Sequence, residues 1–444
     1  MPVSTRAAAD RSGAARRRLF GLVLALTVAA LGGCASLTYT DVMHQVDQDL
    51  AAQHPQAALK SLDKLSGAGD RTLYLLNKAM VQRMAGDYAG SVQSFEQVKP
   101  VMAYLEATSV SETAGALTLS EGLRSYTPPL YERLLAHVYE GLDYLQLGQT
   151  DAARVEVLQI DDLLKRLYPN ADAAPNGGDA FPRYFSGLVY ESRGEYSDAM
   201  IAYRQAYQAY KAGGVSDAAM PSDLKQSLCR FADYLGLKDE RDRYAKTFGL
   251  ESWPPVQTDD PQGQVVFIFS DGLGPGKDSK GAYLQNPLNG RFYNLTLPVL
   301  QRREPGVGAA EISVAGRDVR SQRVANIAAD ASRQLEADKP KLLADEFARN
   351  VTRELAANAA DRKGQGLGTL LSFVGAVLDQ ADTRIWGTLP DNIQLARLRL
   401  APGTYDMTVQ LEGGAGRIGS KVLKDVAVQA GQTTFTALQW VSYH

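Results

Sequence analysis

Residues 193–206 read RGEYSDAMIAYRQA, and two other segments repeat their pattern: AGDYAGSVQSFEQV at 85–98 and LGQTDAARVEVLQI at 147–160. Each segment places a glycine before a short polar turn, then a small residue and apolar residues at helical spacing. Glycine ends a helix readily because it tolerates a positive φ, and apolar residues three and four apart share one helix face. An amphipathic stretch also precedes each turn. The pattern therefore predicts stacked pairs of helices from about residue 38 to residue 250.

These segments resemble the second half of a tetratricopeptide repeat. The glycines are 62 and then 46 residues apart, whereas the family's period is about 34 residues, so we expect loops between the repeats. The resemblance implies a solenoid with a concave face that binds peptides or proteins. The residues expected to pack the helix pairs are Gly86, Tyr88, Gly148, Ala152, Gly194, Tyr196, Ala199 and Tyr203.

The pattern changes after a boundary rich in proline, glycine and aspartate at 252–264. VVFIFS at 265–270 and RFYNLTLPVL at 291–300 are typical of strands, and residues 391–412 read as strand, turn and strand. KVLKDVAVQ and TTFTALQWV, separated by Ala-Gly-Gln, predict a hairpin. We also expect helices at about 340–362 and 366–380, and the second of these is apolar and rich in glycine. It is interpreted either as a buried helix or as a surface that meets a partner or the membrane.

Together these patterns predict an α+β multidomain protein. An all-α, tetratricopeptide-like solenoid occupies residues 34–251, and 252–264 form a linker. Residues 265–444 then form a small β-sandwich-like domain with inserted helices. The mature chain is long enough for two or three domains.

The first 33 residues have the layout of a secretory signal. They hold five arginines, a single acid at Asp10 and the apolar run LFGLVLALTVAAL, which is shorter than the roughly 20 residues of a membrane span. The following Leu-Gly-Gly-Cys resembles the lipobox of bacterial lipoproteins. That resemblance implies cleavage before Cys34 and attachment of fatty acyl chains, such as palmitate, at its thiol. Because Ala35 is not aspartate, it also implies sorting to the outer membrane.

Composition narrows the function classes. The formal charge falls from −3 to −7 when residues 1–33 leave with five arginines and one aspartate, which disfavours a nucleic-acid partner. With Cys34 acylated, Cys229 has no intramolecular partner for a disulfide. Its place in the apolar pattern LKQSLCRFADYL predicts a small buried core residue.

The chain shows no pattern that predicts catalysis, a metal, a cofactor or a nucleotide. The histidines have no metal-ligand spacing. The segment SDGLGPGKDSKG at 270–281 departs from a phosphate loop at Asp271 and Asp278, so we expect a mobile connection with solvated Lys277 and Lys280. His137 is expected to be packed or hydrogen-bonded. The acids Glu132, Glu140, Asp161 and Asp162 are interpreted as members of solvated helix faces.

The whole arrangement resembles a family of bacterial lipoproteins with degenerate tetratricopeptide-like helices and a C-terminal β-rich domain. The resemblance rests on YERLLAHVYEGLDYLQLGQTDAARVE, RYFSGLVYESRGEYSDAMIAY and ADTRIWGTLPDNIQLARLRLAPGTY. It implies a periplasm-facing scaffold on the outer membrane that binds proteins of envelope assembly. Two alternatives use the β-rich domain: an enzyme acting on cell wall or polysaccharide, or a carbohydrate-binding module. An exposed aromatic row involving Tyr405, Trp386 or Trp440 would favour the module.

Overall fold

The structure is a computed structural model that describes residues 39–67, 70–109, 126–169, 178–256, 261–285, 290–361, 381–414 and 416–442. The signal expected at 1–33, Cys34, Ala35 and the helix expected at 366–380 lie outside the described residues. Within the described residues, no helix combines the length and the apolar character needed to cross a membrane.

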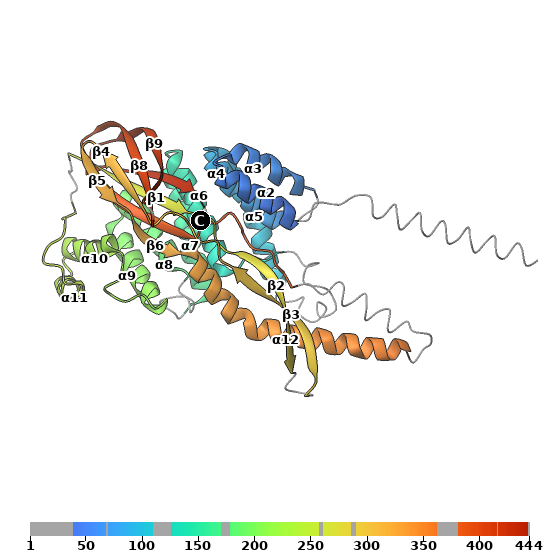
Figure 1. Cartoon of the computed structure of the whole chain (residues 1–444). Coiled ribbons are helices and arrows are strands. Elements are labelled where there is room, and N and C mark those ends of the chain that lie inside the picture. Colours follow the sequence, from blue (N-terminus) through green and yellow to red (C-terminus); the bar gives the residue numbers. More distant parts are fainter. Residues whose placement is uncertain are drawn as a thin grey trace, which may run out of the picture.

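The N-terminal half is a solenoid of helix pairs, as the repeats predict (Figure 1). Gly86, Gly148 and Gly194 adopt φ of 81°, 72° and 74° in the turns of three pairs, which confirms their role in ending the first helix. The pairs are α2 (Tyr39–Ala51) with α3 (Pro55–Leu62), α4 (Arg71–Met84) with α5 (Tyr88–Ser109), α6 (Leu130–Gln146) with α7 (Thr150–Leu167), α8 (Ala180–Ser192) with α9 (Tyr196–Ala212), and α10 (Ser222–Tyr234) with α11 (Lys238–Phe248); a short 3-10 helix, η1 (Asp63–Leu65), follows α3.

The two helices of a pair differ in burial. In α8 every residue from Ala180 to Tyr190 is buried, whereas α9 buries a stripe that includes Ala199, Tyr203 and Ala206. A helix buried all round must have neighbours on every side. α8 is therefore covered on the side that faces away from α9.

The C-terminal half contains a β-sandwich, as predicted. One sheet has the order β10-β1-β7-β6 and the other β5-β4-β8-β9. Phe267 and Phe269 on β1 pack between the sheets against Ile312 and Met407. The strands are β1 (Gly263–Asp271), β4 (Ala309–Val314), β5 (Arg317–Arg320), β6 (Gln322–Asn326), β7 (Asn392–Leu400), β8 (Gly403–Gly413), β9 (Gly416–Val428) and β10 (Thr433–Trp440).

The predicted hairpin of 421–429 with 433–441 is wrong. β9 pairs antiparallel with β8, whereas β10 pairs parallel with β1 in the other sheet. The residues between β9 and β10 carry the chain from one sheet to the other. The Ala-Pro between β7 and β8 also connects the two sheets. Alternation of apolar residues predicts which face of a strand is buried, but it does not identify the neighbouring strand.

A hairpin and a long helix project from this body (Figure 1). The hairpin consists of β2 (Gly276–Gln285) and β3 (Phe292–Gln301), and α12 (Ile327–Asp361) packs against β3. The prediction of a mobile connection at 270–281 is therefore wrong: the connection is the short buried stretch 272–275, and β2 follows it. α12 begins at Ile327, before the expected residue 340, and it continues through Pro340. Proline favours the first turn of a helix, so its place inside α12 is unusual.

Candidate functional site

The inner face of the solenoid, formed by the first helices of the pairs, is covered by the sandwich. Tyr139 of α6 hydrogen-bonds through its hydroxyl to Ser270 Oγ of β1 at 3.2 Å, and Gln146 Nε2 donates to the carbonyl of Phe435 on β10 at 3.0 Å. Val266 and Ile268 of β1 belong to the same apolar core as the solenoid helices. The face that binds peptides in tetratricopeptide arrays is thus occupied by the chain's own sheet.

A cluster of buried charges joins the two halves. Arg397 of β7 contacts Glu191 of α8 through Nη1 at 2.6 Å and Asp223 of α10 through Nε at 2.9 Å. Arg230 Nη2 lies 3.0 Å from Glu191 Oε1. Burial alone would raise the pKa of Glu191, but the two guanidinium groups outweigh it and hold that pKa at about 2. Glu191 is therefore an anion at neutral pH.

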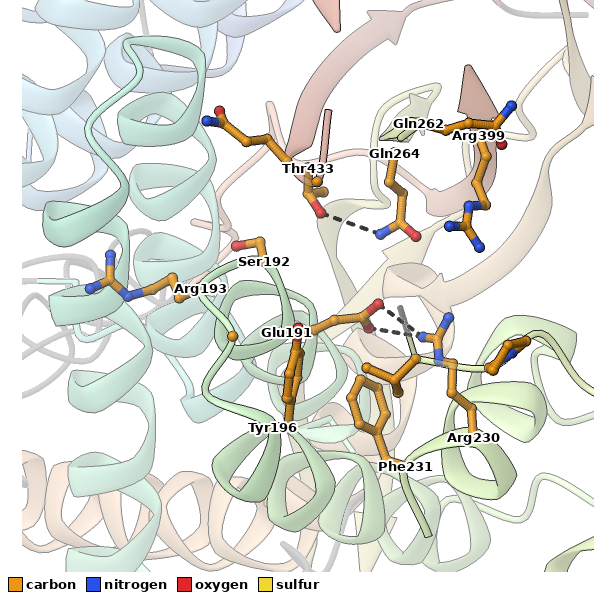
Figure 2. A pocket seen from close by; sticks show the side chains of 15 residues that line it. Glu191, Ser192, Arg193, Tyr196, Arg230, Phe231, Gln262, Gln264, Arg399 and Thr433 are labelled. Atoms are coloured by element: carbon orange, nitrogen blue, oxygen red, sulfur yellow. Dashed lines mark hydrogen bonds and ion pairs between the residues drawn. The ribbon is translucent and has the colours of Figure 1, made fainter. Parts of the chain in front are cut away.

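A polar pocket of about 300 Å³ opens beside this cluster. Figure 2 shows Glu191 and Arg230 joined on one side and Gln264 bonded to Thr433 on the other. The pocket can recognise a ligand through amides and guanidinium groups. A carboxyl group whose pKa is about 2 is ionised at neutral pH, so Glu191 has no proton to give as a general acid.

A second cavity, of about 360 Å³, lies between α5 and α7 over α6. We call it the outer groove. Its apolar lining comes from Pro100, Met102, Ala103, Val155 and Leu163, and its charged lining from Glu96, Lys99, Arg133, His137, Glu156, Asp162 and Arg166.

Four ionisable side chains meet below the outer groove. Lys99 Nζ lies 2.9 Å from Glu140 Oε2 and 3.0 Å from Glu156 Oε1, and His137 Nδ1 lies 2.7 Å from Glu156 Oε2. Burial and the neighbouring Glu156 raise the pKa of Glu140 to about 9. Burial would lower the pKa of Lys99, but the two carboxylates outweigh it and raise that pKa. His137 is hydrogen-bonded, as expected.

The prediction that Glu132 and Glu140 lie on solvated helix faces is wrong. Both are wholly buried, and Glu132 accepts hydrogen bonds from the hydroxyls of Tyr126 and Tyr131. Their helix, α6, is covered on both sides, which its own sequence does not reveal. Asp161 is half-buried, and Asp162 is exposed as expected.

His137, Glu140 and Glu156 carry donor atoms that a metal ion could use. Their ligand atoms lie within 4.8 Å of one another, a spacing that a divalent cation could bridge. The ammonium of Lys99, however, already lies between the carboxyl groups of Glu140 and Glu156 at hydrogen-bond distance, and Glu156 is the member whose pKa is lowered. The three residues therefore fit an internal ion-pair cluster better than a metal centre.

Glu140→Gln is expected to flatten the pH dependence of stability. The folded protein keeps the Glu140 proton up to about pH 9, whereas the unfolded chain releases it near pH 4.5. Because of this carboxyl group, the free energy of unfolding falls as the pH rises between those values. The amide of the Glu140→Gln variant does not titrate, so the variant should not show this fall. Urea unfolding at pH 5 and pH 8 measures the effect, with Glu336→Gln, at a side chain that is 69% exposed on α12, as control. An equal change in both variants would contradict the assignment.

The predicted repeat residues occupy the turns and the faces that join the helices of each pair. Ala199 and Tyr203 are wholly buried, and Tyr88 and Tyr196 are half-buried. Ala152 is only half-buried; its neighbour Ala153 is the wholly buried small residue of that repeat. Cys229 is buried, as predicted, and burial raises the pKa of its thiol to about 11.

Gly187 of α8 is a packing residue that the repeat pattern did not reveal. A Cβ added there would lie 2.4 Å from Cε1 of Tyr203. The repeat pattern predicts Tyr203 as a packing residue, but it does not predict Gly187 as its neighbour. We expect Gly187→Ala to lower the free energy of unfolding by about 1–3 kcal/mol, because overpacking must displace the ring. Thermal unfolding measures the loss, and Gly187→Ala combined with Tyr203→Leu should recover part of it. No loss in the single variant would contradict this close contact.

Comparison with known proteins gives only distant similarities. No protein-family model matches the chain, and no curated protein matches it. A crystal structure of MamA covers 46% of this chain and 91% of its own, with 17% identity and a TM-score of 0.29. The apo form of RapI covers 50% and 56%, with 12% identity and a TM-score of 0.36. A Podosopora anserina kinesin light chain protein with nearly identical TPR-like repeats covers 47% and 92%, with 14% identity and a TM-score of 0.32. The functional argument therefore rests on this chain's own residues.

Proposed function

We propose that this protein is a lipid-anchored scaffold on the periplasmic face of the outer membrane, where it binds a protein partner in the outer groove. The observation that carries the proposal is the covered inner face. A partner cannot use that face while the sandwich lies on it, so the accessible apolar groove lies on the other side of the array.

The surface around the outer groove supports this choice. Val155 and Leu158 of α7 are 50% and 41% exposed, and Tyr104 of α5 is 68% exposed. Apolar side chains that gather at the rim of a groove are typical of protein-binding surfaces. The charged residues of the lining supply hydrogen bonds that can select among partners.

The anchor is supported by the sequence of the first 35 residues. Acyl chains on Cys34 contribute about 0.8 kcal/mol for each buried methylene, so two or three chains hold a protein firmly. Ala35 favours the outer membrane. We infer that the partners belong to the machinery that assembles or maintains the cell envelope.

The alternative of a carbohydrate-binding module loses its main support. Trp386 is 1% exposed and packs on Phe95, and Tyr405 is half-buried and donates a hydrogen bond to the carbonyl of Ala401. Trp440 is also half-buried. The three rings therefore form no exposed row. The enzyme alternative stays a prediction. Among the described residues, no side chain is assigned a catalytic role.

Site-specific photo-crosslinking in intact cells tests the proposal. A photoreactive amino acid replaces Val155 or Leu158, and the control position is the exposed Lys424 of β9. We expect the same protein adduct from both groove positions and no such adduct from Lys424. The charged double variant V155E/L158E should abolish recovery of that partner. Equal adducts from all three positions, or none from the groove, would contradict docking in the outer groove.

The anchor requires a separate measurement. Metabolic labelling with an alkyne fatty acid should mark the wild-type chain and leave Cys34→Ala unlabelled, and the variant should leave the membrane fraction. Labelling that persists in the Cys34→Ala variant would refute acylation at this cysteine.

A further inference from the structure

The projecting hairpin packs one of its faces on α12. Tyr293 of β3 donates a hydrogen bond from its hydroxyl to Glu354 Oε2 at 3.1 Å, and its ring meets that of Phe347 edge-on at 6.2 Å. Leu295, on the same face, is wholly buried. This face of the hairpin is therefore already used by the chain itself.

The opposite face carries two of the most exposed aromatic side chains of the described residues. Tyr283 is 77% exposed and Phe292 is 70% exposed. Tyr283 pairs with Asn294, and Phe292 pairs with Gln285. Residues that pair across an antiparallel ladder, or lie two apart on one strand, share a face. Tyr283 and Phe292 are thus diagonal neighbours on the outer face of the hairpin.

The outer face has no carboxylate. Beyond its root it consists of alternate residues of β2 and β3, and tyrosine is its sole ionisable type. These residues are Ser279, Gly281, Tyr283, Gln285, Phe292, Asn294, Thr296 and Pro298, whereas Leu300 at the root packs against the apolar core of the helices. Such a face can approach an anionic surface without bringing negative charge close to it.

The aromatic pair is small for a protein interface. A wholly exposed aromatic side chain offers about 150–250 Å², so the two together expose roughly 300 Å². A stable protein interface buries about 800 Å² on each partner. A lipid surface needs no such area when an anchor elsewhere on the chain supplies most of the affinity. Aromatic side chains are also favoured at the level of lipid headgroups.

The root of the hairpin lies beside the helix nearest the anchor. Arg303, just after β3, forms an ion pair with Asp47 of α2 and donates through Nε to the carbonyl of Gly274 at 2.6 Å. α2 begins at Tyr39, five residues after Cys34. Five extended residues span at most about 18 Å, and the ten residues of β2 span about 33 Å. The root of the hairpin therefore lies against the helix whose first residue follows Cys34 by five positions.

We propose that the outer face of this hairpin is a second membrane contact, in which Tyr283 and Phe292 insert among the headgroups of the bilayer that holds Cys34. The contact rests on the proposed lipid anchor. It sets the orientation of the scaffold, because a single flexible tether leaves a protein free to rotate, whereas two points of contact restrict it.

Fluorescence depth measurements in vesicles test the contact. The acylated full-length protein is reconstituted in vesicles of phosphatidylethanolamine and phosphatidylglycerol, with Tyr283→Cys carrying a bimane label. Cys229 is buried and Cys34 is acylated, so the new cysteine alone should react. The matched control carries the label at Lys424→Cys, an exposed position on β9. We expect lipids with a headgroup-level nitroxide to quench bimane at 283 several-fold more than at 424.

A second variant checks that the aromatic side chains cause the contact. With the label at Gln285→Cys, quenching should fall about threefold when Phe292→Ser and Tyr283→Ser are introduced together. Circular dichroism should stay unchanged, because both rings are exposed.

The outcomes separate the contact from the anchor. Co-flotation of an acylated protein whose label at 283 is quenched no more than the label at 424 would overturn the membrane contact and leave the anchor intact. Protection of position 283 in envelope fractions but not in vesicles would place a protein on this face instead. Absence of acylation at Cys34 would overturn both proposals together.

Discussion

Arg397→Met is expected to lower the free energy of unfolding by about 3 kcal/mol, because it leaves the largely buried carboxylate of Asp223 without its guanidinium partner and leaves Glu191 paired with Arg230 alone. Arg397 contacts both Glu191 and Asp223, and these acids belong to two different solenoid helices. Urea unfolding measures the loss. The control is Arg320→Met, whose side chain is 67% exposed and paired with Glu412 at the surface. A surface pair contributes about 0–1 kcal/mol.

The contact of Arg397 with Asp223 also predicts a rescue. Asp223→Asn removes the charge that Arg397→Met leaves unpaired, whereas Glu191 keeps Arg230 as its partner, so the double variant should be more stable than the sum of its single changes implies. If Arg397→Met lowers the free energy of unfolding no more than Arg320→Met does, the ion pairs between Arg397 and the solenoid are absent in solution.

Trp386→Ala is expected to cost about 3–5 kcal/mol, the usual loss for deleting a wholly buried large aromatic side chain. The ring lies edge-on to Phe95 of α5 at 6.1 Å, and the backbone N–H of Trp386 donates to Glu132 of α6 at 3.4 Å. The variant should lower the thermal midpoint of the whole protein in one transition. Phe292→Ala, which deletes an exposed ring, should change stability by less than about 0.5 kcal/mol. Separate transitions in Trp386→Ala, with the helices unaffected, would contradict a shared core.

The sequence predicted the solenoid well because its signals are local. Gly194 and Tyr203 lie within ten residues of each other, and turn chemistry and helical spacing connect them directly. The same holds for VVFIFS, whose continuous apolar run indicates a strand buried on both faces. Such a run implies that both faces of the strand are packed: the solenoid helices pack on one face of β1, and the second sheet packs on the other.

The parts that escaped prediction depend on contacts between distant segments. β10 pairs with β1 across more than 160 residues of chain, and a local pattern cannot distinguish this partner from β9. Glu132 and Glu140 look like solvated acids because the residues that bury them include segments far along the chain, such as Trp386. Arg397 carried no signal at all: an arginine in a strand is usually exposed, and its two acids lie some 200 residues upstream.

These long-range contacts change the functional conclusion more than the fold. A tetratricopeptide-like array suggests an open inner face, whereas this chain fills that face with its own sheet. The proposed partner and membrane contacts therefore use the outer groove and the outer face of the hairpin. Both proposals therefore depend on the sandwich staying in place on the solenoid in solution.

Alkylation of a single cysteine at Ser270 tests this arrangement most directly. Ser270 lies on the helix-facing side of β1 and is 4% exposed, and its Oγ contacts the hydroxyl of Tyr139. In a Cys229→Ser background, we predict that Ser270→Cys reacts with iodoacetamide roughly a thousandfold more slowly than Lys424→Cys, because reaction requires opening of the core. Equal rates at the two positions would show that the inner face is open, and would contradict the central claim.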